Sequence, residues 1–172
     1  MSLADQKILG LTLHAPHGEL VAMGLKTIEN RGWAPPPWML GRYIAVHQST
    51  RWDQEGADYY RRNHPRYLVD PPMLQECKFG IIAVARVVGW VQRAELGERP
   101  RTVAMLPGFA FGDQVDALGH SVDWRWFSGA EYGWVLRDVK RIEPVAARGL
   151  QKLWQLPRPT YESVRRRWAK AA

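Results

Sequence analysis

The 172-residue sequence has a single cysteine, Cys77, and no long apolar run. One thiol forms no internal disulfide and supplies no multi-cysteine zinc site, so we expect Cys77 to be a small buried apolar residue. No segment approaches the roughly 18 apolar residues of a membrane-spanning helix. The N-terminal residues lack the pattern of a signal peptide, and the scattered glycines form no phosphate-binding loop. These absences favour a reduced, cytoplasmic protein with no metal, no cofactor and no membrane partner.

The positive charge is confined to one end of the chain. The formal net charge is +7, with 46% hydrophobic and 24% charged residues, which is typical of a folded globular domain. Residues 1–136 contain 14 basic and 14 acidic side chains, whereas residues 137–172 contain 10 basic and 3 acidic ones. Arginine supplies 18 of the 24 basic residues. Its planar fork suits phosphates and base edges, although a GC-rich genome explains the same bias.

Hydrophobic patterning predicts an α+β fold. Alternating and β-branched segments predict strands, and proline or aspartate at the start of a segment favours helices. Residues 93–121 are rich in glycine and proline and predict a long irregular connection. We expect a small mixed β-barrel of five to six strands flanked by short helices. The predicted strands are 8–14, 42–48, 80–91, 122–127 and 132–142, with 26–31 extended; the predicted helices are 16–23, 53–63 (capped by Asp53), a short one at Pro71-Pro72, and 161–170 (capped by Thr160), after a turn at Leu150–Leu156.

Three segments, in this order, resemble the ASCH domain family of the PUA-like superfamily. The first, residues 11–33, carries the signature GxKxxExR as Gly24, Lys26, Glu29 and Arg31. The second is GRYIAVHQS at 41–49, and the third is FGIIAVARVVGWV, followed after the long connection by YGWVLRDVKRIEPVAARGLQKLWQL. The resemblance predicts an ASCH/PUA-like domain over 1–157, with 93–121 as a loop insertion. The basic C-terminal helix, 158–172, lies outside it.

The resemblance implies a barrel with a cleft beside the signature, in which the family is thought to bind RNA or nucleotide-like ligands. A few small members resemble amidohydrolases of acetylated cytidine, and ribonuclease activity has been proposed for others. The amidohydrolase members carry a lysine at the position of Lys26 but pair it with a threonine, where this sequence has Glu29. That departure removes the hydroxyl group that the resemblance assigns to their mechanism.

The signature residues themselves suggest two roles. Glu29 and Arg31 are two apart and share one face of an extended chain, so they either form an ion pair or both line a cleft. A carboxylate accepts from the exocyclic amine of a base, and an arginine binds a phosphate or an acceptor edge. Lys26 joins them only if the turn at Gly24-Leu25 persists through it, and a desolvated lysine is an alternative general base. Asn30, on the other face, is expected to bond backbone groups nearby.

Other candidate ligand contacts lie on neighbouring segments. Trp33 and Trp134 either stack on a base or pack in the core. His47 and Ser49 share one strand face, so both are expected in the cleft, with a half-buried structural histidine as the alternative. His14 and His17 are three apart, but a third metal ligand is lacking. Arg165 and Arg166 are candidates for contact with phosphates, the alternative being a solvated terminal helix.

These residues lead to one main hypothesis and two alternatives. The main hypothesis is a module that binds single-stranded RNA or a nucleotide-like ligand and holds an unpaired or modified base. Its contacts would be Lys26, Glu29, Arg31, Trp33, His47, Ser49 and Trp134 in the cleft, with Arg165 and Arg166 on the backbone. The first alternative is a hydrolase of a modified nucleoside or an RNA phosphodiester, with Lys26, His47 and Glu29 as catalytic candidates. The second is a protein-interaction module. The sequence leaves the oligomeric state open.

Overall fold

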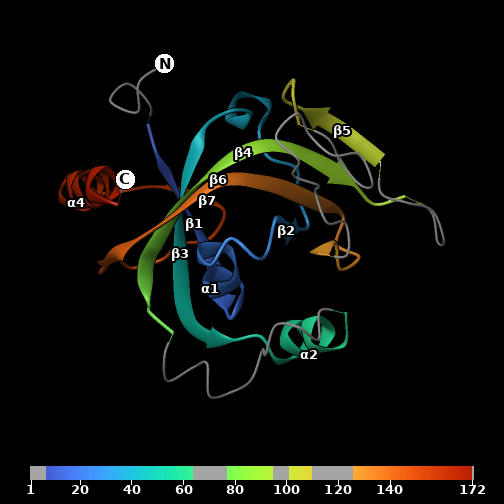
Figure 1. Cartoon of the computed structure of the whole chain (residues 1–172), viewed down its shortest axis with the longest axis horizontal. Coiled ribbons are helices and arrows are strands. Elements are labelled where there is room, and N and C mark those ends of the chain that lie inside the picture. Colours follow the sequence, from blue (N-terminus) through green and yellow to red (C-terminus); the bar gives the residue numbers. More distant parts are fainter. Residues whose placement is uncertain (1–6, 64–76, 95–100, 110–125, 172) are drawn as a thin grey trace. The chain divides into compact units, whose positions relative to one another are not determined.

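A computed structural model describes residues 7–63, 77–94, 101–109 and 126–171 (Figure 1). It contains both strands and helices, which confirms the predicted α+β class. No helix in these ranges is long and apolar enough to cross a membrane. The elements are β1 (Leu9–Ala15), α1 (His17–Ala22), β2 (Ile28–Arg31), the 3-10 helix η2 (Pro37–Met39), β3 (Tyr43–Trp52), α2 (Gln54–Asn63), β4 (Gly80–Gln92), β5 (Arg101–Met105), β6 (Tyr132–Val145), β7 (Leu153–Gln155) and α4 (Arg158–Lys170).

The sheet contains more strands than the sequence predicts. Its order is β2-β6-β4-β3-β1-β7, and β5 pairs with β4, which makes seven strands among the described residues rather than five to six. β5 lies inside the stretch predicted to be irregular, and β7 lies inside the predicted turn at Leu150–Leu156. Both are too short for a recognisable alternation, and they form because a partner strand supplies their hydrogen bonds. The predicted helix at Pro71-Pro72 and residues 122–125 of a predicted strand lie outside the described residues.

The chain divides into two compact units. Unit 1 contains Met1–Leu25, Tyr43–Ala85 and Asp138–Ala172, and unit 2 contains Lys26–Arg42 and Arg86–Arg137. β4 and β6 therefore each contribute residues to both units.

In unit 1, β1 lies between two strands. It pairs in parallel with β3, from Leu9 opposite Ile44 to Leu13 opposite Gln48, and antiparallel with β7, where Gly10 lies opposite Trp154. Strand β1 is therefore hydrogen-bonded along both edges. The N–H and C=O groups at these edges bond to strands from distant parts of the sequence.

Helix α4 packs into the core of unit 1 through one side. Val164 and Trp168 are buried in a cluster with Ile8, which precedes β1, and with residues of β3, β4, β6 and β7, and the Trp168 ring lies 4.8 Å from that of Tyr43. The helix begins at Arg158, earlier than predicted, and Thr160 lies inside it rather than at its cap. Proline is tolerated in a first helical turn because the amide groups there need no helical partner, so Pro159 does not delay the start.

In unit 2, β2 pairs antiparallel with β6, so that Glu29 lies opposite Trp134 and Asn30 opposite Gly133. The Asn30 amide donates to the Trp126 carbonyl (2.8 Å) and its Oδ1 accepts from the Ser128 amide (2.9 Å). The backbone partners of Asn30 are therefore almost 100 residues away in sequence, not local as the sequence suggested. The side chain ties β2 to the segment that precedes β6.

Candidate functional site

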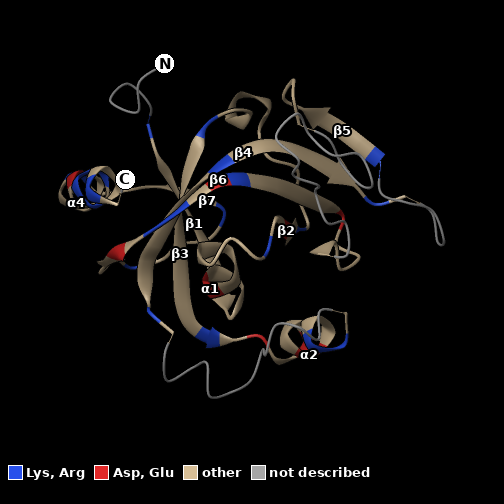
Figure 2. Ribbon diagram, viewed as in Figure 1, with Lys and Arg blue, Asp and Glu red and all other residues tan. Residues whose placement is uncertain are grey.

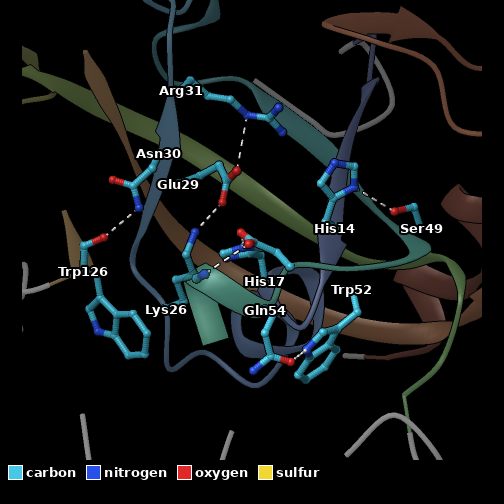
Figure 3. A network of polar contacts seen from close by, with 12 residues as sticks. His14, His17, Lys26, Glu29, Asn30, Arg31, Ser49, Trp52, Gln54 and Trp126 are labelled. Carbon is cyan, nitrogen blue, oxygen red and sulfur yellow. Dashed lines mark hydrogen bonds and ion pairs between the residues drawn. The ribbon is translucent and has the colours of Figure 1, made fainter. Parts of the chain in front are cut away.

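The three charged signature residues form one connected set in unit 2 (Figure 3). The Lys26 ammonium donates to Glu29 Oε2, and Arg31 Nε lies 3.3 Å from Glu29 Oε1. The exposed fractions of these side chains are 0% for Lys26, 7% for Glu29 and 20% for Arg31. Exposure therefore increases along the set, from a buried ammonium to a partly open guanidinium.

Local backbone structure explains this arrangement. Gly24 has φ +73°, a left-handed conformation that favours glycine, and it ends α1 with its amide bonded to the Val21 carbonyl. The Thr27 carbonyl accepts from the Leu136 amide, and Glu29 is then fixed by the pairing of β2 with β6. Lys26 lies in the irregular stretch between the turn at Met23–Gly24 and β2, so it reaches Glu29 although the turn does not persist through it as the sequence required.

Glu29 carries two cations on one carboxylate, so the set has a net charge of +1. A buried ammonium without a counter-charge is strongly unfavourable, and the Lys26–Glu29 pair avoids that cost. Arginine has five N–H donors, of which Nε faces Glu29. The arrangement can therefore hold a guanidinium in a fixed orientation toward an anion or an acceptor edge, with Lys26 acting as a positioning residue.

The two tryptophans of the predicted cleft also contact each other in unit 2. Trp134 is fully buried, and its indole N–H donates to the Trp33 carbonyl at 3.0 Å. The two rings meet edge to face, with centroids 4.7 Å apart. Trp134 therefore supports Trp33, and the half-buried Trp33 is the one whose ring retains solvent-accessible surface.

His47 belongs to unit 1 and is buried, with 5% of its surface exposed. Its Nε2 donates to the Ala147 carbonyl at 3.0 Å, and because a carbonyl only accepts, this nitrogen carries the hydrogen. Burial lowers the pKa of His47, and the hydrogen bond to Ala147 offsets part of that effect. His47 is therefore a neutral imidazole with its N–H committed to the backbone.

Gly149 closes the space beside the His47 ring. A Cβ on Gly149 would lie 2.5 Å from His47 Nδ1 and 2.6 Å from Thr12 Oγ1. Thr12 Oγ1 also accepts from the indole of Trp154 at 3.1 Å. Gly149 and Trp154, which both lie in the third segment that resembles the family, thus pack against this histidine.

Ser49 bonds a different histidine of unit 1. His14 Nδ1 and Ser49 Oγ are 3.1 Å apart (Figure 3). His17 Nε2 donates to Asp53 Oδ2 at 2.6 Å, and this bond is the largest of the effects that lower the pKa of Asp53 to about 2. Asp53 Oδ1 also accepts from the Gly56 amide at 3.0 Å, which confirms the predicted cap of α2.

The sequence reasoning missed the pairing of His17 with Asp53, since their contact depends on how α1 and α2 meet in three dimensions. Among the described residues, no group of three or more His, Cys, Asp or Glu side chains is arranged to hold a metal ion. The seven predicted cleft residues thus fall into two sets, Lys26, Glu29, Arg31, Trp33 and Trp134 in unit 2, and His47 and Ser49 in unit 1. Their arrangement around a single cleft stays a prediction.

The basic residues of α4 differ in exposure and in partners. Arg165 and Arg166 are exposed and line a shallow surface groove with Glu162 and Ala169. Arg167 instead donates to the carbonyls of Glu143 and Pro144. Figure 2 shows the resulting concentration of basic residues along α4. Two of the three consecutive arginines are therefore available to a ligand.

The chain matches no protein-family model and no curated protein. Among solved structures it is similar to an ASCH protein from Zymomonas mobilis, with 16% identity and a TM-score of 0.45 over 94% of this chain and 96% of that one. A tyrosine-to-phenylalanine variant and a serine-to-alanine variant of that protein give 16% identity and a TM-score of 0.46, covering 94% of this chain and 98% and 96% of theirs. The family named in these structures is the one that the three sequence segments resemble.

Proposed function

We propose that this chain binds single-stranded RNA and holds an unpaired or modified base beside the Lys26–Arg31 segment of unit 2. In this proposal Arg31 contacts the ligand, Glu29 orients Arg31, and Lys26 holds Glu29. Trp33 supplies an aromatic surface on which a base stacks. The basic helix α4 adds contacts to phosphates through Arg165 and Arg166.

The observation that carries the proposal is that burial decreases from Lys26 through Glu29 to Arg31. Lys26 and Glu29 are buried and bonded to each other, whereas the guanidinium of Arg31 is held by Glu29 and remains partly open to solvent. A pre-oriented arginine loses less entropy on binding, and its fork matches a phosphate or a guanine edge. The buried pair thus supports the residue that is offered to a ligand.

Trp33 supports the choice of a single strand over a duplex. It lies two residues beyond Arg31, is half-buried, and is held edge-on by Trp134. Bases stack on aromatic side chains only when they are splayed out of a helix, which is how proteins recognise unpaired RNA. An arginine and an aromatic ring close together in sequence fit one nucleotide better than they fit a double-stranded surface.

The contribution of α4 is of a different kind. Arg165 and Arg166 are exposed, and exposed cations bind phosphates without regard to sequence and in a salt-dependent manner. We therefore assign selectivity to the signature residues and general affinity to α4.

The test is the binding of the full chain to a labelled single-stranded oligoribonucleotide of about ten nucleotides, at low and at moderate salt. We expect Arg31→Gln to weaken binding about 5- to 150-fold, the range for loss of a bidentate contact. The double variant Arg165→Glu/Arg166→Glu should lower the slope of log K against log salt by about 2. The double variant Arg51→Glu/Arg62→Glu, which changes two exposed arginines of unit 1 outside α4 and the same net charge, is the matched control and should change the slope less.

Three outcomes contradict the proposal. Equal loss of affinity in the Arg51/Arg62 and α4 variants assigns the effect to net charge alone. Shortening of the oligonucleotide, abolished by Lys26→Met or His47→Gln, favours the hydrolase alternative. The absence of RNA binding at low salt leaves the protein-interaction alternative. The same oligonucleotide as DNA tests the preference for RNA, because only RNA offers the 2′-hydroxyl group.

A further inference from the structure

A second tryptophan of unit 2, Trp38, lies outside the signature and is 53% exposed. Single exposed apolar residues are common on protein surfaces, so exposure alone indicates no function. Trp38 differs because hydrogen bonds hold the backbone around it and because the guanidinium of Arg42 lies beside its ring. The sequence does not mark Trp38, since nothing in a run of prolines distinguishes a solvent-exposed tryptophan from a buried one.

The backbone around Trp38 is fixed on both sides. Pro37 opens η2, and the Met39 and Leu40 amides donate to the Pro36 and Pro37 carbonyls at 2.8 and 3.2 Å. Met39 is buried and anchors this turn in unit 2. Proline restricts φ in the unfolded chain as well as in the folded one. Holding the indole at the surface therefore costs little conformational entropy.

The residues that follow are joined to β4. The Gly41 amide donates to the Val87 carbonyl at 2.7 Å, and the Val87 amide donates to the Arg42 carbonyl at 2.9 Å. Gly41 has φ +82°, a conformation that favours glycine. Trp38 is therefore held against a strand rather than carried on a loose loop.

Two guanidinium groups lie in this turn. Arg42 Nε donates to the Trp38 carbonyl at 2.9 Å, and the guanidinium carbon is 6.0 Å from the centre of the Trp38 ring. Arg86 Nε donates to the Gly41 carbonyl at 3.0 Å. Within the described residues Arg42 has no carboxylate partner. The exposed indole of Trp38 therefore lies next to the guanidinium of Arg42, which pairs with no carboxylate of the described residues.

We propose that Trp38 and Arg42 form a second stacking site for single-stranded nucleic acid, in which a base stacks on the indole and Arg42 contacts the adjoining phosphate. This inference rests on the proposed function and extends it to a further nucleotide. Aromatic rings combined with arginine are the usual means by which proteins bind single strands irrespective of sequence. Trp33 and Trp38 are five residues apart, so their Cα atoms lie at most about 18 Å from each other, within reach of one short strand.

A protein partner fits this surface less well. Stable protein interfaces bury about 800 Å² on each side around an apolar centre with few charges. Of the other exposed large apolar residues described, only Val103 belongs to unit 2, while Met23, Phe79 and Leu150 belong to unit 1. One indole beside an arginine matches an anionic aromatic ligand better than it matches an apolar protein surface.

The test compares two ligands with the full chain: labelled oligouridylate of about ten nucleotides, and a sugar–phosphate strand of equal length that lacks bases. Trp38→Ala should weaken binding to oligouridylate about 5- to 150-fold, the cost of removing one stacking contact. Binding to the abasic strand should stay unchanged. Trp38→Phe keeps a ring and should retain most of the affinity. Phe79→Ala, which removes another exposed aromatic side chain, is the matched control and should affect neither ligand.

Arg42→Gln separates the charge from the ring. It should weaken binding to both ligands and lower the salt slope by about 1, since it removes one phosphate contact. This pattern differs from that of Trp38→Ala, which depends on the presence of bases.

The outcomes distinguish this inference from the proposed function. If Arg31→Gln weakens binding to oligouridylate and Trp38→Ala does not, the second site is wrong while the proposed function stands. Equal losses on both ligands for Trp38→Ala assign the residue a structural role and overturn stacking. If Trp38→Ala converts a dimer to a monomer in sedimentation and leaves RNA affinity unchanged, the indole serves self-association instead. Failure of the unmodified chain to bind either ligand overturns both proposals.

Discussion

Units 1 and 2 each bury a polar centre that the sequence marks as functional, and they stabilise it in opposite ways. Unit 2 keeps charges in its interior and pairs them, with Lys26 and Arg31 on the carboxylate of Glu29. Unit 1 keeps His47 neutral and bonds its only N–H to the Ala147 carbonyl. The two centres are therefore vulnerable to different changes, removal of a partner in unit 2 and crowding or protonation in unit 1.

The same difference separates residues that support a site from residues that can contact a ligand. In unit 2 the guanidinium of Arg31 pairs with Glu29 and stays partly exposed. In unit 1 the N–H of His47 already donates to the Ala147 carbonyl. An N–H that already donates to the backbone stabilises a site but is not available to donate to a ligand. We therefore place ligand contact in unit 2 at Arg31 and assign His47 a structural role in unit 1. Three predictions test how each polar centre is stabilised, from the largest expected effect to the smallest.

Glu29→Gln should have the largest effect on stability. It removes the carboxylate with which the buried Lys26 ammonium pairs, and breaking a buried pair in this way typically costs about 3–5 kcal/mol. Urea unfolding followed by circular dichroism measures the change. Lys26→Met is the control, and it should cost clearly less because Glu29 keeps Arg31 as a partner. An equal or larger cost for Lys26→Met would show that Glu29 does not hold both cations.

Gly149→Ala tests the packing of unit 1. Its Cβ would lie 2.5 Å from His47 Nδ1, so the ring or the backbone must shift. Overpacking of this kind typically costs about 1–3 kcal/mol. The matched control is Gly32→Ala, a glycine with nothing within 4 Å of a Cβ, which should change stability by less than about 0.5 kcal/mol. Similar losses in the two variants contradict the tight packing around His47.

The pH dependence of stability should show the smallest effect. The pKa of His47 is lowered in the folded protein from its ordinary value of 6.5 by burial. The unfolded chain therefore binds more protons just below that pH, and stability should be complete above it and decrease as the pH falls toward the folded pKa. Thermal unfolding between pH 7 and pH 5 measures the decrease, which His47→Gln should reduce. An unchanged profile in His47→Gln assigns the decrease to another group.

Asp53 contributes to a separate, more acidic range. Its pKa is lowered from 3.8 to about 2, mainly by the hydrogen bond from His17. Its contribution is therefore present above pH 3.8 and is lost as the pH falls from there toward 2. The two ranges are distinct, so His47→Gln should leave the acidic one in place.

Local patterns in the sequence predicted the main elements and part of the site. β-branched runs located β3 and β4, Asp53 marked the start of α2, and the two-residue spacing predicted that Glu29 and Arg31 share one face, with an ion pair as one of two alternatives. These features depend on neighbouring residues, which is why a single sequence contains them. The buried pair of Lys26 with Glu29 was left conditional, because it depends on the conformation of one turn.

Features that depend on distant contacts were not predictable in this way. β7 has three residues and exists through its pairing with β1, and α4 begins at Arg158 because its far end is anchored by Val164 and Trp168. The burial of Trp134 and the exposure of Trp38 likewise follow from packing, since both residues are aromatic and have apolar neighbours in sequence. Burial of a particular aromatic residue is set by the whole fold rather than by its own segment.

The position of β1 between β3 and β7 has a consequence for synthesis of the chain on the ribosome. β1 and β3 become available early, but β7 and α4 emerge last, after all the residues of unit 2. Until then one edge of β1 is an open template for pairing with other chains, and it lacks the aromatic cover that Trp154 provides at Gly10. A nascent chain should therefore be more prone to aggregate until β7 has emerged and paired with β1.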